Sequence, residues 1–260
     1  MTSGISRILA KGAHPISPCW QNADKLPRRP SLRRGFFVPV RWLAQRAVSV
    51  CFPGSTSGRG WYSHNHIRRF GGNFGGGGAV DTLILIDFQV GFENPVWGTR
   101  NNPQAEDQAQ RLLQRWRETN QSVVHIRHIS TTPGSPLSGS GTAFIDRLRP
   151  ATGEVVFEKQ VNSAFIGTHL ESHLRGIGAT DLTICGLTTP HCVSTSTRMA
   201  ANLGFSVRLV ADACAAFTAN ADVSFDTGPA FTAEEIHRSA LAHLHGEFAQ
   251  VCTGDRVLSV

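Results

Sequence analysis

Short apolar segments alternate with amphipathic helical segments from Val80 onward, and this alternation constrains the fold more than any other feature. The helical segments carry apolar residues three and four positions apart, which is typical of a helix with one buried face. Strands that alternate with helices predict right-handed crossovers and a mainly parallel sheet covered on both faces. We therefore predict a three-layer α/β/α sandwich with a Rossmann-like, six-stranded sheet. The strands are expected at 82–86, 122–128, 154–159, 181–187, 206–211 and 257–260.

Capping signals predict where the helices between these strands begin. Asn-Pro at 102–103 is typical of a helix start, because proline is favoured at the first helical position. Thr168 and Glu171 have the spacing of a capping box, and so do Thr232 and Glu235. A further helix is expected at 192–202, closed by a glycine two residues later.

Residues 1–78 differ from the rest of the chain in charge and composition. They hold twelve Lys or Arg residues and a single acid, Asp24, for a formal net charge of +11, whereas residues 79–260 hold 13 basic and 18 acidic residues, or −5. The stretch is rich in Arg, Pro, Ser and Gly and lacks periodicity. We interpret it as a disordered extension, or as the result of a start codon assigned too far upstream, attached to one domain at 79–260. An organelle transit peptide and a nucleic-acid contact are the alternatives.

The cysteine pattern and the apolar runs indicate the cellular compartment of the protein. Its six cysteines form no CxxC pair and no dense spacing, so we expect free thiols in the cytoplasm rather than a disulfide framework. No apolar run approaches the roughly 20 residues that span a bilayer, which predicts a protein without a transmembrane segment. We expect a homo-oligomer, a dimer or a tetramer, that acts on a small molecule. Nucleic acid is not an expected partner.

Polar residues end several of the predicted strands, and ligands bind at the carboxyl ends of parallel strands. Asp87, His128 and Lys159 each end a strand, and Cys192 opens the helix after the fourth strand. Positive charge from that helix terminus and from Lys159 predicts a lowered pKa for the Cys192 thiol. Asp87 would accept the thiol proton and later return it to a departing amine. Each residue alone fits a structural role, as a buried thiol, a capping acid or a solvated charge, but their convergence favours catalysis.

Four segments of the chain form an ordered set: LILIDFQVGF (83–92), VVFEKQVNSAF (155–165), ICGLTTPHCVSTSTRMAANLGF (184–205) and LHGEFAQV (244–251). In these segments the chain resembles the isochorismatase-like cysteine hydrolases, which include nicotinamidases, N-carbamoylsarcosine amidase and streptothricin hydrolase. The resemblance covers about residues 80–260. It implies a hydrolase that cleaves a C–N bond of a small molecule through a thioester, with Asp87, Lys159 and Cys192 as the catalytic residues.

The same resemblance implies a cis peptide bond between Leu187 and Thr188. It also implies an oxyanion hole built from the backbone N–H groups of Thr188 and Cys192. One alternative is hydrolysis of a vinyl ether, as in the isochorismatases proper, although these lack the nucleophilic cysteine. Another is an inactive member that binds a small ligand or serves as a scaffold. The joint presence of Asp87, Lys159 and Cys192 favours the amidase-type hydrolase, because a scaffold needs none of them.

The histidines do not match the metal site that nicotinamidases of the family carry. No His lies between Asp87 and His125, and His125 and His128 are three residues apart on a strand, so they face opposite sides. We therefore predict no metal and no other cofactor, and a substrate other than nicotinamide.

Further candidates line the expected pocket or fill the core. The competing role is a structural hydrogen bond for His128 and core packing for the aromatic residues, while His191 either lines the site or faces away. We interpret Asp212 as a turn residue. Cysteines 185, 214 and 252 are expected to be core thiols. The residues predicted to line the pocket are Phe92, Trp97, His128, Phe165 and His191.

Overall fold

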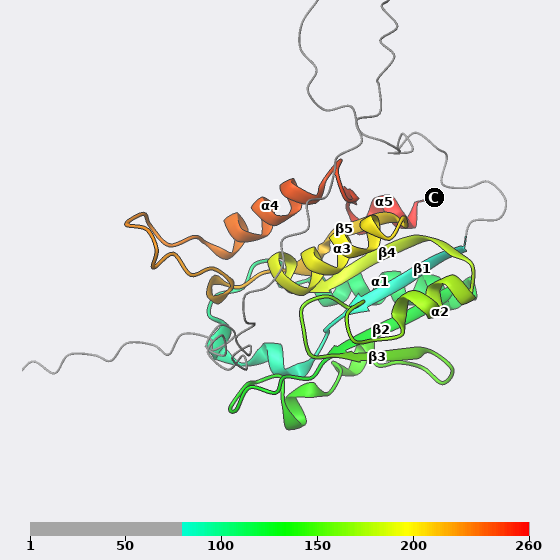
Figure 1. Ribbon diagram of the computed structural model, residues 1–260, viewed down its shortest axis with the longest axis horizontal. Helices are drawn as coiled ribbons and strands as arrows, with labels where there is room; N and C mark the ends of the chain where they lie inside the picture. Colours follow the sequence, from blue (N-terminus) through cyan, green and yellow to red (C-terminus); the bar gives the residue numbers. More distant parts are fainter. Residues whose placement is uncertain (1–79, 260) are drawn as a thin grey trace, which may run out of the picture. The chain divides into compact units, whose positions relative to one another are not determined.

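A six-stranded sheet forms the centre of the computed structural model, which describes residues 80–259 (Figure 1). All neighbouring strands are parallel, and their order is β3-β2-β1-β4-β5-β6. The direction of strand addition reverses between β1 and β4, and ligands bind at such a switch point. The interpretations of residues 1–78 lie outside the described residues. The strands are β1 Val80–Ile86, β2 Ser122–His128, β3 Val155–Lys159, β4 Ala179–Leu187, β5 Ser206–Ala215 and β6 Gln250–Cys252.

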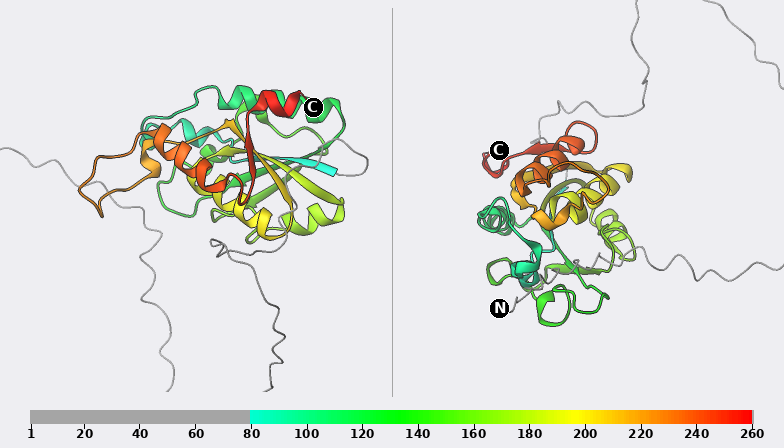
Figure 2. Two further views of the ribbon diagram at one scale, coloured as in Figure 1. Left: turned by 90° about the horizontal axis from the view of Figure 1, so that it is seen from above. Right: turned by 90° about the vertical axis from the view of Figure 1, so that its left-hand side faces the viewer.

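Helices cover both faces of this sheet. Figure 2 shows α1 and α5 together on one face and α2, α3 and α4 on the other. The predicted three-layer α/β/α sandwich with a six-stranded sheet is therefore confirmed, and every strand pair in it is parallel. The helices are α1 Ala105–Glu118, α2 Leu170–Gly176, α3 Ser194–Asn202, α4 Ala233–Leu244 and α5 Gly254–Leu258.

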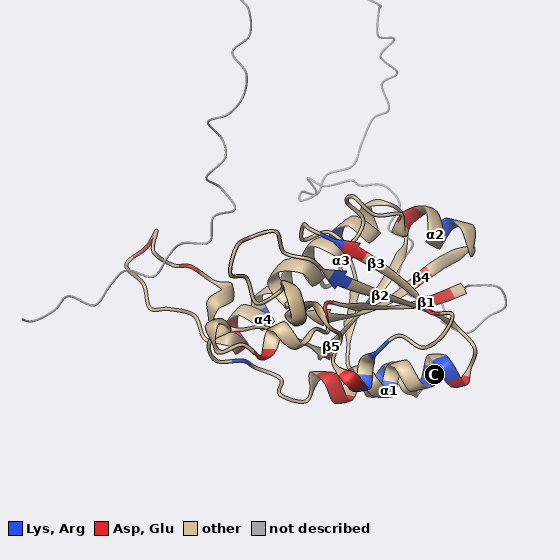
Figure 3. Cartoon of the chain, turned by 90° about the horizontal axis from the view of Figure 1, so that it is seen from below, with Lys and Arg blue, Asp and Glu red and all other residues tan. Residues whose placement is uncertain are grey.

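The core lies between the layers, where the apolar periodicity of each element is satisfied. The segment 83–86 of β1 is buried on both faces, as expected for a central parallel strand. In α1, Ala109, Leu112 and Trp116 are buried on the face that packs on the sheet. Acidic and basic positions are interspersed along the elements drawn in Figure 3. Within residues 80–259, no helix is both long and apolar enough to cross a membrane.

The C-terminal end of the fold differs from the sequence prediction. The last strand is β6, and the predicted strand at 257–260 is wrong, because its described part belongs to α5 and the residue that follows. Asp212, interpreted as a turn residue, lies within β5. Its Oδ1 accepts a hydrogen bond from Gly254 N at 2.7 Å, which fixes the first residue of α5 against β5.

Two of the predicted helix starts also differ. Asn102, with a φ of 40°, does not cap α1; its side chain instead donates to Cys214 O at 2.8 Å, and the helix begins at residue 105. Thr168 does not form a capping box with α2, because His169 is the residue at the N-cap; the Thr168 hydroxyl donates to Ala164 O and accepts from Leu170 N. The box at Thr232 is confirmed at the start of α4.

The strand register brings four carboxyl ends to the same edge of the sheet. Ile86 at the end of β1 pairs with Ile126 of β2 and with Gly186 of β4, and the last residues of β2 and β3 pair with each other. Gly186 has a φ of 147°, and a Cβ there would lie 2.2 Å from Ile86 O. Only glycine therefore permits β1 and β4 to approach this closely where they end.

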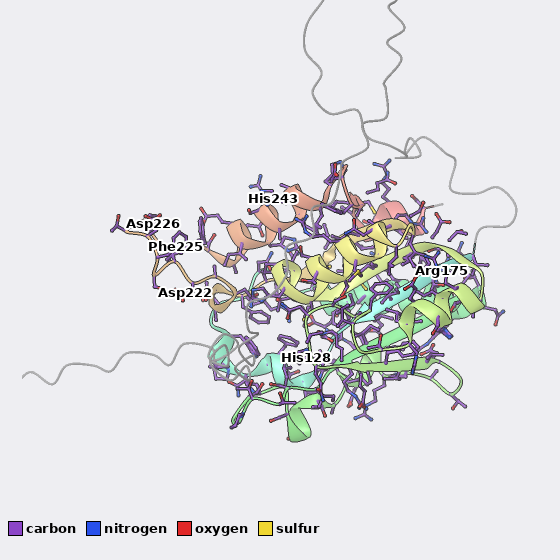
Figure 4. The ribbon with its side chains drawn as sticks, in the orientation of Figure 1. His128, Arg175, Asp222, Phe225, Asp226 and His243 are labelled. Carbon is purple, nitrogen blue, oxygen red and sulfur yellow. The ribbon has the colours of Figure 1, made fainter. Side chains whose placement is uncertain are left out.

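One segment extends beyond the compact layers on the same side as these carboxyl ends. Residues 221–232, between the 3₁₀ turn Thr218–Asn220 and α4, run outward in Figure 1. Phe225, labelled in Figure 4, lies in this segment, and 85% of it is exposed.

Candidate active site

Four side chains from different parts of the chain meet at the carboxyl edge of the sheet. Lys159, which ends β3, places its Nζ 2.7 Å from Asp87 Oδ2, 3.1 Å from Cys192 Sγ and 3.0 Å from His128 Nδ1. Asp87 follows β1, His128 ends β2, and Cys192 lies between β4 and α3. Figure 4 labels His128 near this edge and Arg175 near the opposite one. The structure therefore brings together the three residues that the sequence predicts to be catalytic.

Asp87 is wholly buried where β1 ends. Its φ is 55°, and its N–H donates to Ile126 O at 2.9 Å. Burial raises the pKa of this carboxyl, while the Lys159 ammonium opposes the rise. Oδ1 has no partner at normal hydrogen-bond distance among the described residues, and a carboxylate oxygen of Asp87 lies within 4.8 Å of Cys192 Sγ. A raised pKa and an available oxygen near a thiol suit a group that accepts and returns a proton.

Lys159 joins the other three side chains through its ammonium group. An ammonium has three N–H donors, and the three neighbours of Nζ account for all of them. Burial by itself would lower the pKa of Lys159, but the negative charge of Asp87 and the sulfur of Cys192 outweigh it and raise the pKa above its usual value. Lys159 is thus a buried cation that fixes the geometry of its neighbours.

Cys192 lies in a π-helical turn, Thr189–Val193, directly before α3 rather than at the first residue of a helix. Burial and the negative charge of Asp87 raise the pKa of its thiol to about 12, although Lys159 acts in the opposite direction. The sequence-based prediction of a lowered thiol pKa is therefore wrong. The reason is that burial, which the sequence pattern does not reveal, outweighs the nearby positive charges. Burial thus favours the neutral thiol over the thiolate.

The turn that carries Cys192 is held by its own backbone and by a buried histidine. The peptide bond between Leu187 and Thr188 is cis, at the position that the resemblance implies. Thr188 O accepts hydrogen bonds from two backbone N–H groups of the turn, at 3.1 and 3.3 Å. Thr189 Oγ1 lies 2.7 Å from Nδ1 of His237, whose Nε2 lies 3.3 Å from the Asn102 side chain. These contacts fix the turn against α4 and the end of β5.

Two polar residues near the cluster were missed by the sequence analysis. Gln89 is fully buried; its Oε1 accepts from His128 N at 2.8 Å, and its Nε2 donates to His128 O at 3.0 Å. Asn162 places its Oδ1 3.8 Å from Cys192 Sγ. Both lie within the motif segments, two residues after Asp87 and three after Lys159, and that proximity is the signal that could have identified them.

The predicted pocket residues do not share one environment. Phe92 and Trp97 pack together with Phe217, at centroid distances of 5.1 Å between the first two and 5.9 Å between Phe92 and Phe217. Phe92 and Gln89 also line a cavity of about 140 Å³ on the side of α1. His191 is exposed in the π-helical turn.

Phe165 has a different environment from the other predicted pocket residues. It is 9% exposed, and its ring stacks on Phe205, which directly precedes β5 at the amino edge of the sheet. This contact fits the alternative role of core packing, and Phe92 belongs to the same buried core.

The positions of Asp87, His128, Lys159 and Cys192 indicate whether the cluster could hold a metal ion. Ligand-type atoms of Asp87, His128 and Cys192 lie within 4.8 Å of one another, a grouping that could hold an ion. The Lys159 ammonium, however, hydrogen-bonds to all three, so the position of a cation is already taken by a protonated amine. His125 faces elsewhere, with its Nε2 2.8 Å from a Glu154 oxygen.

Dialysis of the protein against a strong chelator is therefore expected to leave its activity unchanged. The physical reason is that Lys159 supplies the positive charge that a metal would otherwise bring to Asp87 and Cys192. The measurement is the hydrolysis rate before and after dialysis, with metal content determined on the same samples. An activity loss that added zinc or iron reverses would contradict the metal-free site.

Comparison with known proteins identifies the family of this chain and agrees with the fold. The Isochorismatase domain model matches residues 81–256. YrdC of Bacillus subtilis, an uncharacterised isochorismatase family protein, is 42% identical over 179 residues, or 68% of this chain and 94% of that protein. A solved structure from Chromobacterium violaceum, assigned to the isochorismatase family of hydrolases, is 42% identical, with a TM-score of 0.65 over 69% of this chain and 92% of that one.

Some of the relatives have names that state a reaction. The maleamate amidohydrolase of Pseudomonas putida is 30% identical over 157 residues, which cover 52% of this chain and 72% of that protein. Because the family model spans most of the described residues, this chain belongs to the isochorismatase family of hydrolases.

Proposed function

We propose that this protein is a cysteine hydrolase that cleaves the C–N bond of a small amide through a thioester intermediate. The observation that carries the proposal is the buried, hydrogen-bonded cluster of Asp87, Lys159 and Cys192, in which an acid, a cation and a thiol are in contact. The similarity to a protein named maleamate amidohydrolase supports an amide as the substrate class.

The first step joins the thiol to the carbonyl carbon. Asp87 takes the proton of the Cys192 thiol as Sγ attacks, since a thiol with a pKa of about 12 does not ionise by itself near neutral pH. The raised pKa of Asp87 makes it a stronger base than an ordinary carboxylate. The N–H groups of Thr188 and Cys192 would stabilise the oxyanion, and such a donor commonly contributes about 3 kcal/mol to the transition state.

The second half of the cycle releases the two products. As the C–N bond breaks, Asp87 gives its proton to the departing amine and leaves an acyl thioester on Cys192. Water then attacks the thioester carbonyl, with Asp87 accepting one water proton. The C–S bond breaks, the acid product leaves, and the proton returns to Sγ. Lys159 stays protonated throughout and balances the charge that moves between Asp87 and Cys192.

A hydrolysis screen tests this proposal against its alternatives. The substrates are small primary amides including maleamate, carbamoyl compounds, lactams and isochorismate, each assayed with the wild-type protein and with Cys192→Ala. Amide hydrolysis that the variant loses supports the proposal. Isochorismate hydrolysis that survives in Cys192→Ala would instead indicate a vinyl-ether hydrolase, and binding without any turnover would indicate an inactive ligand-binding member.

A fragment comprising residues 79–260 is expected to fold and to keep full activity. All six strands and the whole cluster lie within it, and the matched part of this chain spans 94% of YrdC. The check is to compare the solubility, thermal unfolding and hydrolysis rate of the fragment with those of the full chain. An insoluble or inactive fragment would show that the basic N-terminal stretch contributes to the fold or the site.

A further inference from the structure

The hydrogen bonds around His128 determine which of its ring nitrogens carries a proton. Lys159 Nζ lies 3.0 Å from His128 Nδ1, and an ammonium can only donate. Nδ1 must therefore be an unprotonated acceptor, and in a neutral ring the proton is on Nε2. Burial and the Lys159 charge lower the pKa of His128 to about 4, which agrees with a neutral ring at working pH.

The Nε2–H group of His128 is not used within the described part of the protein. No hydrogen bond joins it to another residue of the range 80–259, and the ring is only half-buried. A ring nitrogen of His128 lies within 4.8 Å of Cys192 Sγ. A fixed N–H donor thus remains available on a ring that belongs to the cluster around Lys159.

Gln89 keeps this donor in place. Its side-chain amide binds both the N–H and the C=O of His128, and its Nε2 also lies 3.3 Å from Thr142 O. The amide thereby continues the β1–β2 hydrogen-bond pattern one step beyond Asp87, where the backbone of β1 turns away. His128 is consequently held at its backbone by Gln89 and at its ring by Lys159.

His125, on the same strand, shows what a structural histidine looks like in this fold. It is 1% exposed, and its Nε2 is bonded to Glu154 at 2.8 Å on the other side of the strand. The Nε2 atom of His125 has a hydrogen-bond partner in the described part of the protein, whereas that of His128 has none there. The difference indicates a role for His128 beyond packing.

We propose that His128 Nε2–H donates a hydrogen bond to an oxygen of the substrate beside the scissile amide. This inference rests on the proposed function and narrows its substrate class to small amides that carry a second acceptor oxygen. A carboxylate is the preferred acceptor, because hydrogen bonds to an ionised oxygen are the strongest. His128 is then a specificity-determining residue, and Gln89 is the residue that positions it.

Two substitutions test the roles of the two ring nitrogens of His128 separately. In His128→Asn the amide oxygen can replace Nδ1 as the acceptor for Lys159, but no atom remains at the Nε2 position. In His128→Gln the amide nitrogen can replace the Nε2 donor, but the acceptor for Lys159 is lost. His125→Gln is the matched control, since its amide can still donate to Glu154.

The test compares succinamate with 4-methylpentanamide, in which an isopropyl group replaces the carboxylate. His128→Asn is expected to raise KM for succinamate about 10- to 100-fold, the usual worth of a hydrogen bond to a charged group, without changing KM for the neutral amide. His128→Gln should retain KM and lose kcat, and His125→Gln should match the wild type. Equal effects of His128→Asn on both amides, or a fall in kcat for both, would overturn the inference.

Binding provides a readout that does not depend on turnover. In full-length Cys192→Ala labelled with ¹⁵N-histidine, His128 should show a protonated Nε2 and an unprotonated Nδ1, and succinamate should shift the Nε2 resonance more than the neutral amide does. A protonated Nδ1, or equal shifts with both amides, would contradict the role of His128. Failure of the wild type to hydrolyse any amide would contradict the proposed function while leaving this binding result to decide the inference.

Discussion

Replacing Cys192 with alanine is expected to lower kcat by at least about 10⁴-fold, the scale seen when a hydrolase loses its nucleophile. Without Sγ no thioester forms, and the remaining Asp87 and Lys159 have no group to activate. Steady-state rates of the wild type and variant give the size of the effect. Intact-protein mass spectrometry of the wild type with a slow amide substrate should also detect an acyl adduct on the peptide that contains Cys192.

Two other cysteines in the described chain serve as matched controls. Cys185 and Cys214 are wholly buried within β4 and β5, and burial raises the pKa of each thiol, to about 12 for Cys214. They are thus core thiols, as predicted. Replacing either with alanine should leave kcat unchanged, with at most a small loss of stability. An adduct on Cys185 or Cys214, or full activity in Cys192→Ala, would leave the fold assignment but refute the mechanism.

Replacing Lys159 with methionine is expected to remove activity and to lower the free energy of unfolding by about 3–5 kcal/mol, because it leaves the buried Asp87 carboxylate without its counterion. Lys159 and Asp87 are both fully buried at their side chains, so solvent does not screen the lost interaction. Urea unfolding of the variant measures the change. The double variant Lys159→Met, Asp87→Asn should recover much of the stability while remaining inactive, since no buried charge is left unpaired.

The stability loss in Lys159→Met should depend on pH in a definite direction. Burial raises the pKa of Asp87 above 3.8, and removing Lys159 removes the charge that opposes this rise. A carboxyl with a raised folded-state pKa stabilises the fold below its unfolded pKa, and that contribution is lost as the pH rises through the folded value. The difference in the free energy of unfolding between the wild type and the variant should therefore be larger at pH 8 than at pH 5. The opposite trend would show that Asp87 is not the charge left behind.

Much of the fold could be predicted from the sequence, because apolar periodicity is a local property. The strands up to β5 were identified from runs such as 83–86, and the parallel arrangement followed from their alternation with helices. The predicted meeting of Asp87, Lys159 and Cys192 is likewise observed, since residues that end or follow parallel strands lie at one edge. The last strand was misplaced because Val257, which packs into the core from a short helix, also fits a strand pattern.

Other parts of the site could not be predicted because they depend on burial and on distant contacts. The pKa of Cys192 is raised rather than lowered, since the degree of burial is a property of the packed layers. The two hydrogen bonds between the Gln89 side chain and the His128 backbone join residues 39 positions apart. His237 approaches Thr189 from α4, 48 residues further along the chain. No local pattern encodes these contacts, so the fold must be known before they are visible.

The close approach of Gly186 to Ile86 has a consequence for which parts of the fold can change among related proteins. It fixes β1, which precedes the proposed acid Asp87, against β4, which precedes the proposed nucleophile Cys192, so the two residues share one rigid frame. The outward segment that holds Phe225 emerges from the same edge, but it carries none of those groups. New substrate preferences can thus evolve by exchanging such peripheral segments while the chemistry is inherited intact. A transplant of residues 221–232 between relatives is therefore expected to leave the cluster of Asp87, Lys159 and Cys192 unchanged.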